Sequence, residues 1–231
     1  IKFLRKIRKA QLINEYLKEN KVKGIIADHW KSLEHLKNEK KKYCLIHGKE
    51  INHPKGTLLN KRMNKSFKKS NFVIANSKYT KELAISVGIE EKKIHIINPG
   101  TNYPLEILKE YKNKAKDIFK DSFPKIITIA RLDKRKSHQN IIMTIRNLKT
   151  IYPKIKYVCI GDGEEKNNLL DLKKQLKLND DIIFFNKIDE KLKTALLNES
   201  DLFLMPSIKD KKSVEGFGIS FIEAASYGKG S

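Results

Sequence analysis

The chain has 231 residues, 39% of them hydrophobic, and a formal net charge of +22. This length exceeds the usual size of one domain and predicts two domains of roughly 100 residues each. No apolar run approaches the roughly 20 residues that a membrane-spanning helix needs, so we expect a soluble protein. The two cysteines, Cys44 and Cys159, lie far apart in separate apolar runs. That pattern fits small buried thiols in a reducing compartment better than a disulfide framework.

The positive charge is unevenly distributed along the chain. Residues 1–70 hold 20 Lys and Arg against 6 Asp and Glu, a net charge of +14, and the other residues share the remaining +8. Such asymmetry admits nucleic acid, an anionic membrane surface or an anionic substrate as a partner. Only six of the 49 basic residues are arginine, so a general lysine bias explains the charge equally well without any partner.

Eight short apolar runs follow one another along the chain, and helical patterns separate them. They are rich in β-branched and aromatic residues and do not alternate with polar ones, which predicts buried parallel strands in an α/β fold. The expected strands are 24–28, 43–48, 72–77, 93–100, 125–131, 156–163, 181–186 and 202–207. The expected helices include 4–20, a run ending at Gly88, the polar 107–120, and 139–152, which Pro153 stops.

The most loop-like break lies at residues 98–106, NPGTNYPLE, and we place the domain boundary there, between residues 103 and 104. In a parallel sheet, loops and helix N-termini converge at the carboxyl ends of the strands, where ligands bind. Candidate functional residues are therefore expected just after each strand.

Two cations follow the strand at 125–131. Arg131 ends this run and Lys136 comes five residues later, just before a helix. Cations in that position suit a phosphate or diphosphate, because their charge-assisted hydrogen bonds add to the helix dipole. Taken alone, in so basic a chain, the pair is more typical of a solvated basic turn. The next strand ends in Gly161-Asp162-Gly163, which lacks both the dinucleotide fingerprint and the P-loop pattern and alone indicates a plain turn.

The stretch VEGFGISFIEAASYG, residues 214–228, carries two carboxylates around a flexible turn. Gly216 and Gly218 allow a close backbone approach, and the run after them has helical spacing with Glu223 in its second turn. Free amides at such a helix start suit a phosphate, and carboxylates accept hydrogen bonds from sugar hydroxyls, so the stretch suggests a sugar nucleotide. The alternative is that Glu215 is only an N-terminal charge and Glu223 only a surface residue.

In combination, these motifs resemble the C-terminal domain of retaining glycosyltransferases of family 4, which have the GT-B fold. The resemblance is carried by ARLDKRKSHQNII (130–142), Gly161 to Gly163, Pro206-Ser207 and EGFGISFIEAASYGK (215–229). Upstream, IIADHW (25–30), IHGKEI (46–51), VIANSKYTKEL (73–83) and IHIINPGTN (94–102) resemble the second half of the N-terminal domain. The resemblance implies two Rossmann-like domains facing a cleft, both incomplete: an acceptor-side domain over 1–103 and a nucleotide-sugar-binding domain over 104–231.

The resemblance also implies roles on the donor side. Arg131 and Lys136 would bind the diphosphate and stabilise it as a leaving group without a metal or another cofactor. Glu215 would contact the donor sugar and Glu223 the ribose hydroxyls. The remaining donor-binding residues would act largely through their backbone: Gly161, Asp162, Gly163, Asn186, Lys187, Ile188, Gly216, Phe217, Gly218 and Ile219. The base is expected near residues 186–188, where the contacts would be made largely by the backbone. The sequence therefore does not distinguish between a UDP-, a GDP- and an ADP-sugar as the donor.

On the acceptor side, the resemblance places His47 of His47-Gly48-Lys49-Glu50 near the reacting sugar, with His29 and Glu50 as further candidates. A lone histidine more often has a structural role, and even in the site it would orient a hydroxyl more readily than act as a base.

The function implied is retaining transfer of a sugar to a saccharide or lipid-linked acceptor in cell-surface glycan assembly, such as lipopolysaccharide or capsule. We expect a cytoplasmic protein whose basic region, including the lysine-rich helix 60–71, contacts an anionic membrane peripherally. Both domains look incomplete by this comparison, so an inactive remnant or a basic module that only binds nucleotide or an anionic partner is the alternative. Within the same fold, an epimerase or phosphorylase fits the two motifs less well. Nucleic acid is not expected, because residues 60–71 contain one aromatic, Phe67.

Overall fold

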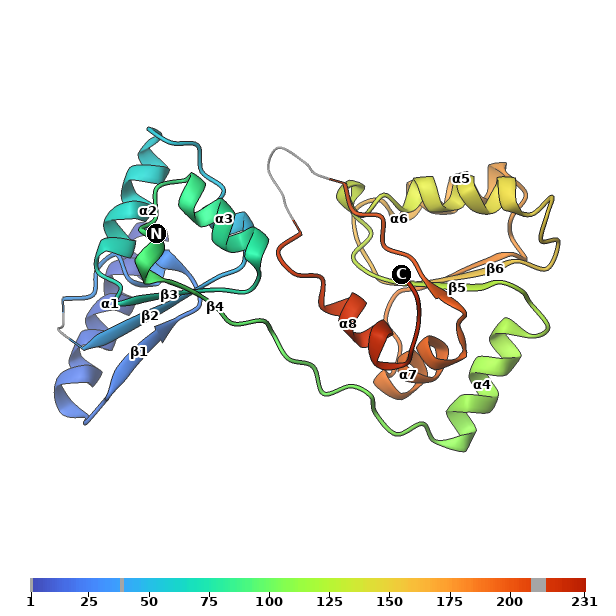
Figure 1. Cartoon of the computed structure of the whole chain (residues 1–231), viewed down its shortest axis with the longest axis horizontal. Coiled ribbons are helices and arrows are strands. Elements are labelled where there is room, and N and C mark those ends of the chain that lie inside the picture. Colours follow the sequence, from blue (N-terminus) through green and yellow to red (C-terminus); the bar gives the residue numbers. More distant parts are fainter. Residues whose placement is uncertain (1, 38–39, 209–214) are drawn as a thin grey trace. The chain divides into compact units, whose positions relative to one another are not determined.

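The computed structural model describes residues 2–37, 40–208 and 215–231, with side chains from Ile7 onward. The chain forms two compact units. The first combines Ile1–Pro99 with Lys211–Phe217, and the second combines Gly100–Asp210 with Gly218–Ser231. Each unit contains one four-stranded sheet in which every strand pair is parallel (Figure 1). This confirms the predicted α/β fold with parallel sheets.

Each of the eight expected strands is present. In the first unit the order across the sheet follows the chain: β1 (Gly24–Ala27), β2 (Lys41–Ile46), β3 (Phe72–Ala75) and β4 (Ile94–Ile96). The second sheet has the order β7-β6-β5-β8, from β5 (Lys125–Ile129), β6 (Lys156–Ile160), β7 (Ile182–Phe185) and β8 (Leu202–Phe203). The apolar runs therefore predicted the positions of the strands in both sheets.

Helices connect the strands, as parallel pairing requires. The first unit contains α1 (Lys2–Glu19), α2 (Leu58–Lys68) and α3 (Lys78–Ser86). The second contains α4 (Lys109–Phe119), α5 (His138–Leu148), α6 (Lys166–Gln175), α7 (Glu190–Glu199) and α8 (Ile219–Ser226). α5 ends four residues before the predicted position, because the amides of Ile151 and Tyr152 both bond to the Leu148 carbonyl and close a turn there.

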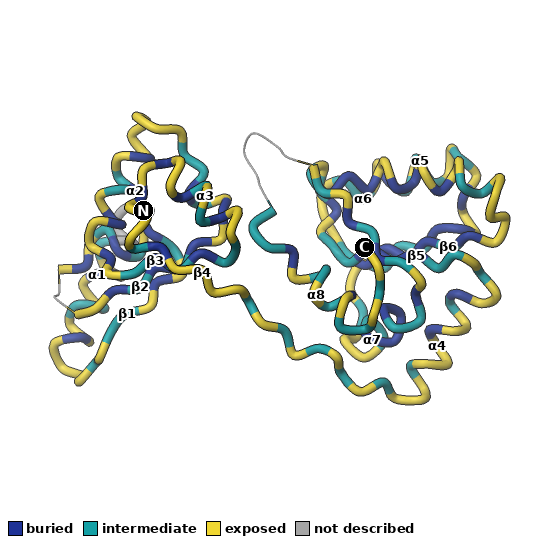
Figure 2. Tube along the Cα trace, in the orientation of Figure 1, coloured by how far each residue is buried: buried dark blue, intermediate teal, exposed yellow. Residues whose placement is uncertain are grey.

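The second unit has a core on both faces of its sheet. Along β5 and β6, successive residues alternate between two buried clusters: Ile127 and Val158 belong to one, Ile126 and Tyr157 to the other. Helices α4, α7 and α8 complete the first cluster, and α5 and α6 complete the second. Buried residues run along both strands in Figure 2. This is the arrangement expected of a parallel sheet covered on both sides.

The first unit has one buried cluster, on one face of its sheet. Cys44 and Val73 point into it together with residues of α2 and α3. The alternate residues Tyr43, Leu45, Phe72 and Ile74 are only partly buried and lie outside that cluster, and Ile26 on β1 is 72% exposed. Tyr43 and Phe72 stack on each other with ring centroids 5.1 Å apart. Among the described residues, this second face of the sheet therefore has no core of its own.

In the described part of the chain, no helix is both long and apolar enough to cross a membrane.

Candidate functional site

Most of the predicted donor residues lie along one edge of the sheet in the second unit. Arg131 comes two residues after β5, Gly161 directly follows β6, and Asn186 directly follows β7. These three strands are neighbours and run parallel. Their carboxyl ends therefore meet at the same edge, which is where α/β sheets bind ligands. The Arg131 side chain is 78% exposed there.

The loop between Arg131 and α5 is held by Asp133, a residue that the motif comparison did not single out. One oxygen of its carboxylate accepts a hydrogen bond from Nη2 of Arg131 at 3.0 Å, and the other accepts one from the backbone N–H of Lys136 at 3.1 Å. Burial opposes ionisation of Asp133, but the bond from Arg131 and the charge of Arg135 outweigh it and lower the pKa. Asp133 thus restrains the side chain of Arg131 and the backbone of Lys136, the two predicted diphosphate ligands.

Lys136 is not a solvated lysine. Its residue exposure is only 7%, and its Nζ lies 3.1 Å from the thioether sulfur of Met205, just beyond β8. Lysine is seldom buried to this extent, which distinguishes this residue from the solvated lysines of a basic turn. Arg131 and Lys136 consequently differ: the first is exposed and the second is enclosed.

The glycines of Gly161-Asp162-Gly163 are required by packing. A Cβ on Gly161 would overlap the carbonyl oxygen of Ala130, and one on Gly163 would overlap that of Leu132. The turn also binds this loop directly, since the Leu132 N–H donates to the Asp162 carbonyl at 3.0 Å. The turn after β6 therefore supports the loop that carries Arg131.

Glu223 lies on α8, which starts at Gly218 in the left-handed conformation with φ 80°. Its Oε2 is 3.7 Å from Nζ of Lys193 on α7, and that ammonium is also 2.7 Å from Glu190. Burial raises the pKa of Glu223, and Lys193 opposes the shift. Lys193 was not predicted, because nothing in the spacing of the motifs indicates which residue of α7 meets α8.

The structure divides the EGFG stretch between the two units. Glu215, Gly216 and Phe217 belong to the first unit, where the Gly216 carbonyl accepts a hydrogen bond from Oγ of Ser77 at 2.5 Å. Gly218, Ile219 and Glu223 belong to the second unit. Glu215 is therefore not brought together with Arg131 and Lys136 within either unit.

On the first unit, His47 directly follows β2 and pairs with Asp28, which directly follows β1. Nε2 of His47 lies 2.9 Å from Oδ1 of Asp28. Glu50 accepts hydrogen bonds from the backbone N–H groups of His47 at 2.5 Å and Gly48 at 3.4 Å, so its carboxylate holds the turn. The sequence analysis did not predict Asp28 as a site residue. Its position directly after a strand that neighbours β2 could have indicated it.

His29 has a structural role in this arrangement. Its Nδ1 accepts a hydrogen bond from the Lys31 N–H at 3.0 Å and caps the short 3-10 turn Trp30–Ser32. Burial, followed by the charge of Lys31, lowers the pKa of His29. A neutral ring suits this capping role, because Nδ1 must remain an acceptor.

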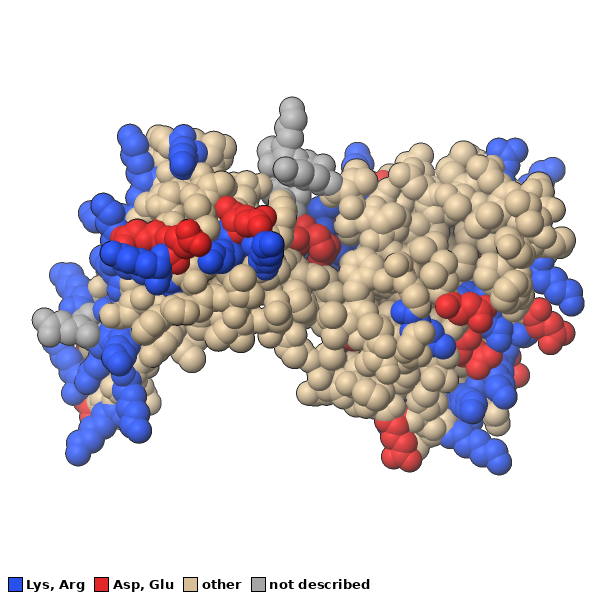
Figure 3. Space-filling model, viewed as in Figure 1, with Lys and Arg blue, Asp and Glu red and all other residues tan. Residues whose placement is uncertain are grey.

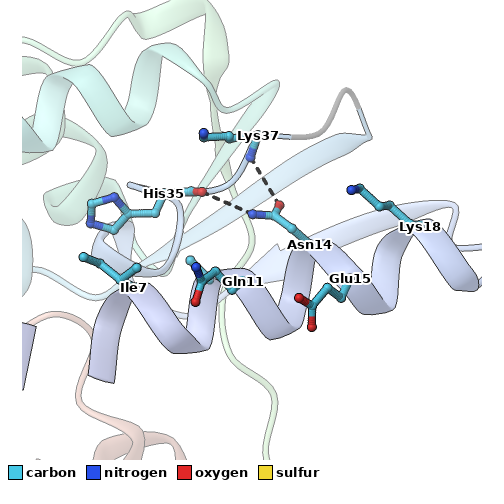
Figure 4. Close-up of a pocket in the computed structure, with 8 residues that line it drawn as sticks. Ile7, Gln11, Asn14, Glu15, Lys18, His35 and Lys37 are labelled. Carbon is cyan, nitrogen blue, oxygen red and sulfur yellow. Dashed lines mark hydrogen bonds between the residues drawn. The ribbon is translucent and has the colours of Figure 1, made fainter. Parts of the chain in front are cut away.

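Two cavities lie away from most of these residues. One of about 410 Å³ runs along α1, where the side-chain amide of Asn14 joins the helix to the backbone of His35 and Lys37 (Figure 4). The other, of about 370 Å³, lies beside the N-terminus of α5 and includes Asp133 and His138. Within residues 2–37, 40–208 and 215–231, no group of three or more His, Cys, Asp or Glu side chains could hold a metal ion.

Known proteins resemble both units. The family model of glycosyl transferases group 1 matches residues 109–230. An uncharacterized glycosyltransferase of Methanocaldococcus jannaschii is 31% identical over 216 residues, which cover 92% of this chain and 50% of the relative. The O-antigen biosynthesis glycosyltransferase WclY of Escherichia coli is 35% identical over 99 residues, covering 43% of this chain and 25% of the relative.

Two further similarities concern a lipid-linked substrate and the fold. The N-acetylgalactosamine-N,N'-diacetylbacillosaminyl-diphospho-undecaprenol 4-alpha-N-acetylgalactosaminyltransferase of Campylobacter jejuni is 34% identical over 120 residues, covering 51% of this chain and 30% of the relative. The crystal structure of HepE from Anabaena in complex with UDP superposes with a TM-score of 0.77 at 18% identity, over 95% of this chain and 61% of HepE.

The extent of these matches limits what they say about activity. This chain spans about half the length of the Methanocaldococcus relative and smaller parts of the others. The solved neighbours are GT-B glycosyltransferases, which confirms the predicted fold class. The family model matches more than half of the residues, from the start of α4 to the penultimate position. The chain therefore belongs to the group 1 glycosyl transferases.

Proposed function

We propose that this chain carries the donor site and part of the acceptor site of a retaining glycosyltransferase of family 4. The enzyme transfers a sugar from a nucleotide-sugar to a saccharide or lipid-linked acceptor in cell-surface glycan assembly. The observation that carries this proposal is the row of predicted donor residues at the carboxyl ends of β5, β6 and β7. The chain spans about half of its Methanocaldococcus relative, and the activity of the whole protein is part of this proposal.

On the donor side, residues 104–231 bind the nucleotide-sugar. Arg131, exposed and oriented by Asp133, binds the diphosphate together with Lys136. Their charges stabilise the negative charge that develops on the leaving diphosphate as the glycosidic bond breaks. Glu215 contacts the sugar and Glu223 the ribose hydroxyls. Burial raises the pKa of Glu223 and Lys193 opposes that shift, which favours the carboxylate form whose two oxygens accept hydrogen bonds.

On the acceptor side, residues 1–103 present His47 to the incoming hydroxyl. Nε2 of His47 is engaged with Asp28, which leaves Nδ1 to accept a hydrogen bond from a hydroxyl of the acceptor next to the attacking one and so to position the acceptor. Asp28 orients the ring, and the leaving diphosphate takes the acceptor proton as the new bond forms on the same face of the sugar. Asp28→Asn is expected to weaken acceptor use, seen as a higher KM for the acceptor, while nucleotide binding is unchanged.

The donor and acceptor classes have limited support from relatives. HepE was crystallised with UDP, and the Campylobacter relative is named for a substrate carried on diphospho-undecaprenol. We therefore place a UDP-sugar first among the UDP-, GDP- and ADP-sugars, and a lipid diphosphate first among acceptors.

The donor site is tested by nucleotide binding and then by transfer. Isothermal titration of the chain with UDP, GDP and ADP is expected to give binding to one of them. Arg131→Ala and Lys136→Ala each remove a charge-assisted contact and should weaken that binding by about tenfold or more. Lys134→Ala, which removes an exposed lysine of the same short turn, is the matched control and should bind normally.

Transfer assays with the whole polypeptide complete this test. Lys136→Ala and Glu215→Ala are expected to abolish transfer without unfolding the protein, as measured by circular dichroism. Near-normal turnover in either variant, or no binding of any nucleotide by the wild type, contradicts the donor-site assignment.

Peripheral membrane contact is proposed from the charge of the first unit. α2 buries Met63 and Phe67 and leaves Lys61, Lys65 and Lys68 exposed, and basic side chains are frequent on the visible surface of this unit (Figure 3). Each exposed lysine contributes about 1 kcal/mol of attraction to an anionic surface. In liposome flotation, the protein should rise with vesicles containing anionic lipid and not with neutral ones. Changing these three lysines to Glu should abolish flotation, and equal partition onto both vesicle types would count against docking.

The same observation weakens the nucleic-acid alternative. Stacking on bases requires exposed aromatic rings among the cations. Phe67, the aromatic of residues 60–71, is 2% exposed and belongs to the core. The remaining alternative, a chain that binds nucleotide without catalysing transfer, predicts normal nucleotide titration together with no turnover in the whole polypeptide.

A further inference from the structure

His138 occupies a buried position that the proposed transfer mechanism does not use. It is the first residue of α5 and is 2% exposed. One ring nitrogen, Nε2, lies 2.9 Å from the backbone carbonyl oxygen of Arg131. The other, Nδ1, lies 3.6 Å from Sγ of Cys159 in the middle of the sheet. The ring therefore joins the start of α5, the end of β5 and the core of β6.

These two contacts fix the proton on the ring. A carbonyl oxygen only accepts, so Nε2 must carry the hydrogen that binds Arg131. Nδ1 is then an acceptor, and the Cys159 thiol is the donor that faces it. Burial raises the pKa of Cys159 to about 12, so the thiol keeps its hydrogen at neutral pH. Burial also lowers the pKa of His138, which keeps the ring neutral.

The charged groups that face His138 come from the loop above it. Asp133 favours protonation of the ring and Lys136 disfavours it, while the β6 side contributes only the neutral thiol. Ser137, which precedes α5, and Gln139 and Asn140 in its first turn are uncharged. The ring is thus enclosed by partners that satisfy one neutral tautomer.

The backbone contact closes the loop that carries both diphosphate ligands. Between Arg131 and His138 the chain makes the short turn Lys134–Lys136 and then passes through Ser137, which is left-handed with φ 57°. Asp133 braces this loop from one side, and the ring of His138 holds its first carbonyl from the core side. This contact restrains the backbone from which the Arg131 side chain extends.

We propose that His138, held as the Nε2–H tautomer by the Cys159 thiol, is a positioning residue for the donor diphosphate, because it fixes the loop from Arg131 to Lys136. The effect on diphosphate binding rests on the proposed donor site. The tautomer of His138 rests only on the geometry of the second unit. Two measurements test these parts separately.

The first measurement is the tautomer, which needs no ligand. Nitrogen-15 NMR of the labelled protein, with His138 assigned from the spectrum of His138→Gln, should show a protonated Nε2 and a bare Nδ1 from about pH 7 to 8. A merely space-filling ring has no fixed preference. An Nδ1–H tautomer or a charged ring in that range overturns the proposal even if nucleotide binds normally.

The second measurement is binding of UDP, GDP and ADP by three variants. His138→Leu removes the donor to Arg131 and should weaken binding of the preferred nucleotide by about tenfold, the loss of one buried hydrogen bond. His138→Gln keeps an N–H near the same place and should stay within about threefold. Ile142→Ala, one turn further along α5 in the same core, controls for general loosening.

The outcomes separate the two proposals. The positioning role is supported if His138→Leu binds nucleotide more weakly while Ile142→Ala keeps an affinity near that of the wild type. The two variants are compared at an equal loss of melting temperature. An equal loss of affinity in both variants, or none in His138→Leu, overturns it. If the wild type binds none of the three nucleotides, the proposed donor site fails, and the NMR result still decides the tautomer.

Discussion

The two units build parallel sheets of four strands each, yet they bury those sheets differently. In the second unit, Ile127 and Val158 face one core while Ile126 and Tyr157 face another. In the first unit, the strands send residues such as Cys44 into a single core, and Leu45 next to it stays partly exposed. The strand sequences are equally apolar in both. Apolar runs therefore identify parallel strands, but they do not say which face another element covers.

The largest expected effect concerns two phenylalanines, one on a strand of each sheet. Phe203 on β8 is fully buried, and Phe203→Ala should lower the free energy of unfolding by about 3–5 kcal/mol. Phe72 on β3 lies on the face without a core, stacked on Tyr43, and Phe72→Ala should cost only about 1 kcal/mol. Urea denaturation measures both. Equal losses would show that the outer face of the first sheet is packed as well as the second core.

The two cysteines provide an internal probe of the same difference. Cys44 and Cys159 are both completely buried, and burial raises the pKa of each to about 12. Their intrinsic reactivity is therefore matched, and labelling requires local opening of the sheet. Iodoacetamide followed by peptide mass spectrometry should modify Cys44 faster than Cys159, by about tenfold if the first sheet opens at a cost lower by about 1.4 kcal/mol. Faster labelling of Cys159 would reverse the comparison.

The pH dependence of stability should distinguish the second unit through His138. Its folded pKa lies below the model value of 6.5, so the unfolded chain takes up the proton first as the pH falls. The contribution of His138 to the free energy of unfolding is fully present above about pH 7. It declines as the pH drops through 6.5 toward the folded pKa, by at most about 1.4 kcal/mol per pH unit for one proton.

Urea unfolding of the wild type and His138→Gln at pH 7 and 5.5 checks this sign. The variant should lose less stability on acidification. An equal loss in the free energy of unfolding in both proteins would mean that other groups cause the pH dependence, such as Asp133, whose pKa is also lowered.

The smallest effects come from a reciprocal pair of backbone positions, one in each unit. Ser137 has φ 57° and Gly88 has φ 97°. Because only glycine adopts this region without strain, Gly88→Ser should cost about 1 kcal/mol. Ser137→Gly should be stabilising by a few tenths, since relief of strain is offset by loss of the 2.8 Å bond between Asn140 and Oγ of Ser137. Thermal unfolding of both variants measures the two signs, and destabilisation by Ser137→Gly would contradict this account.

Much of the fold could be predicted because it depends on local patterns. Apolar runs predicted the strands, and the residues that follow β5, β6 and β7 were expected at one sheet edge for a topological reason. The site partners could not be predicted in the same way. Asp28 and Lys193 meet His47 and Glu223 only through the packing of separate elements. The burial of Lys136 against Met205 likewise depends on where β8 lies.

Gly161 and Gly163 have a consequence for anyone who searches genomes with short motifs. Both glycines are demanded by the carbonyls of Ala130 and Leu132, whether or not a nucleotide ever enters. A descendant that had lost catalysis would still need them to fold. Retention of Gly-Asp-Gly is thus a marker of architecture. A scan meant to separate active enzymes from pseudoenzymes should score the proposed diphosphate ligand Arg131, which is exposed and is not held by the packing of this turn.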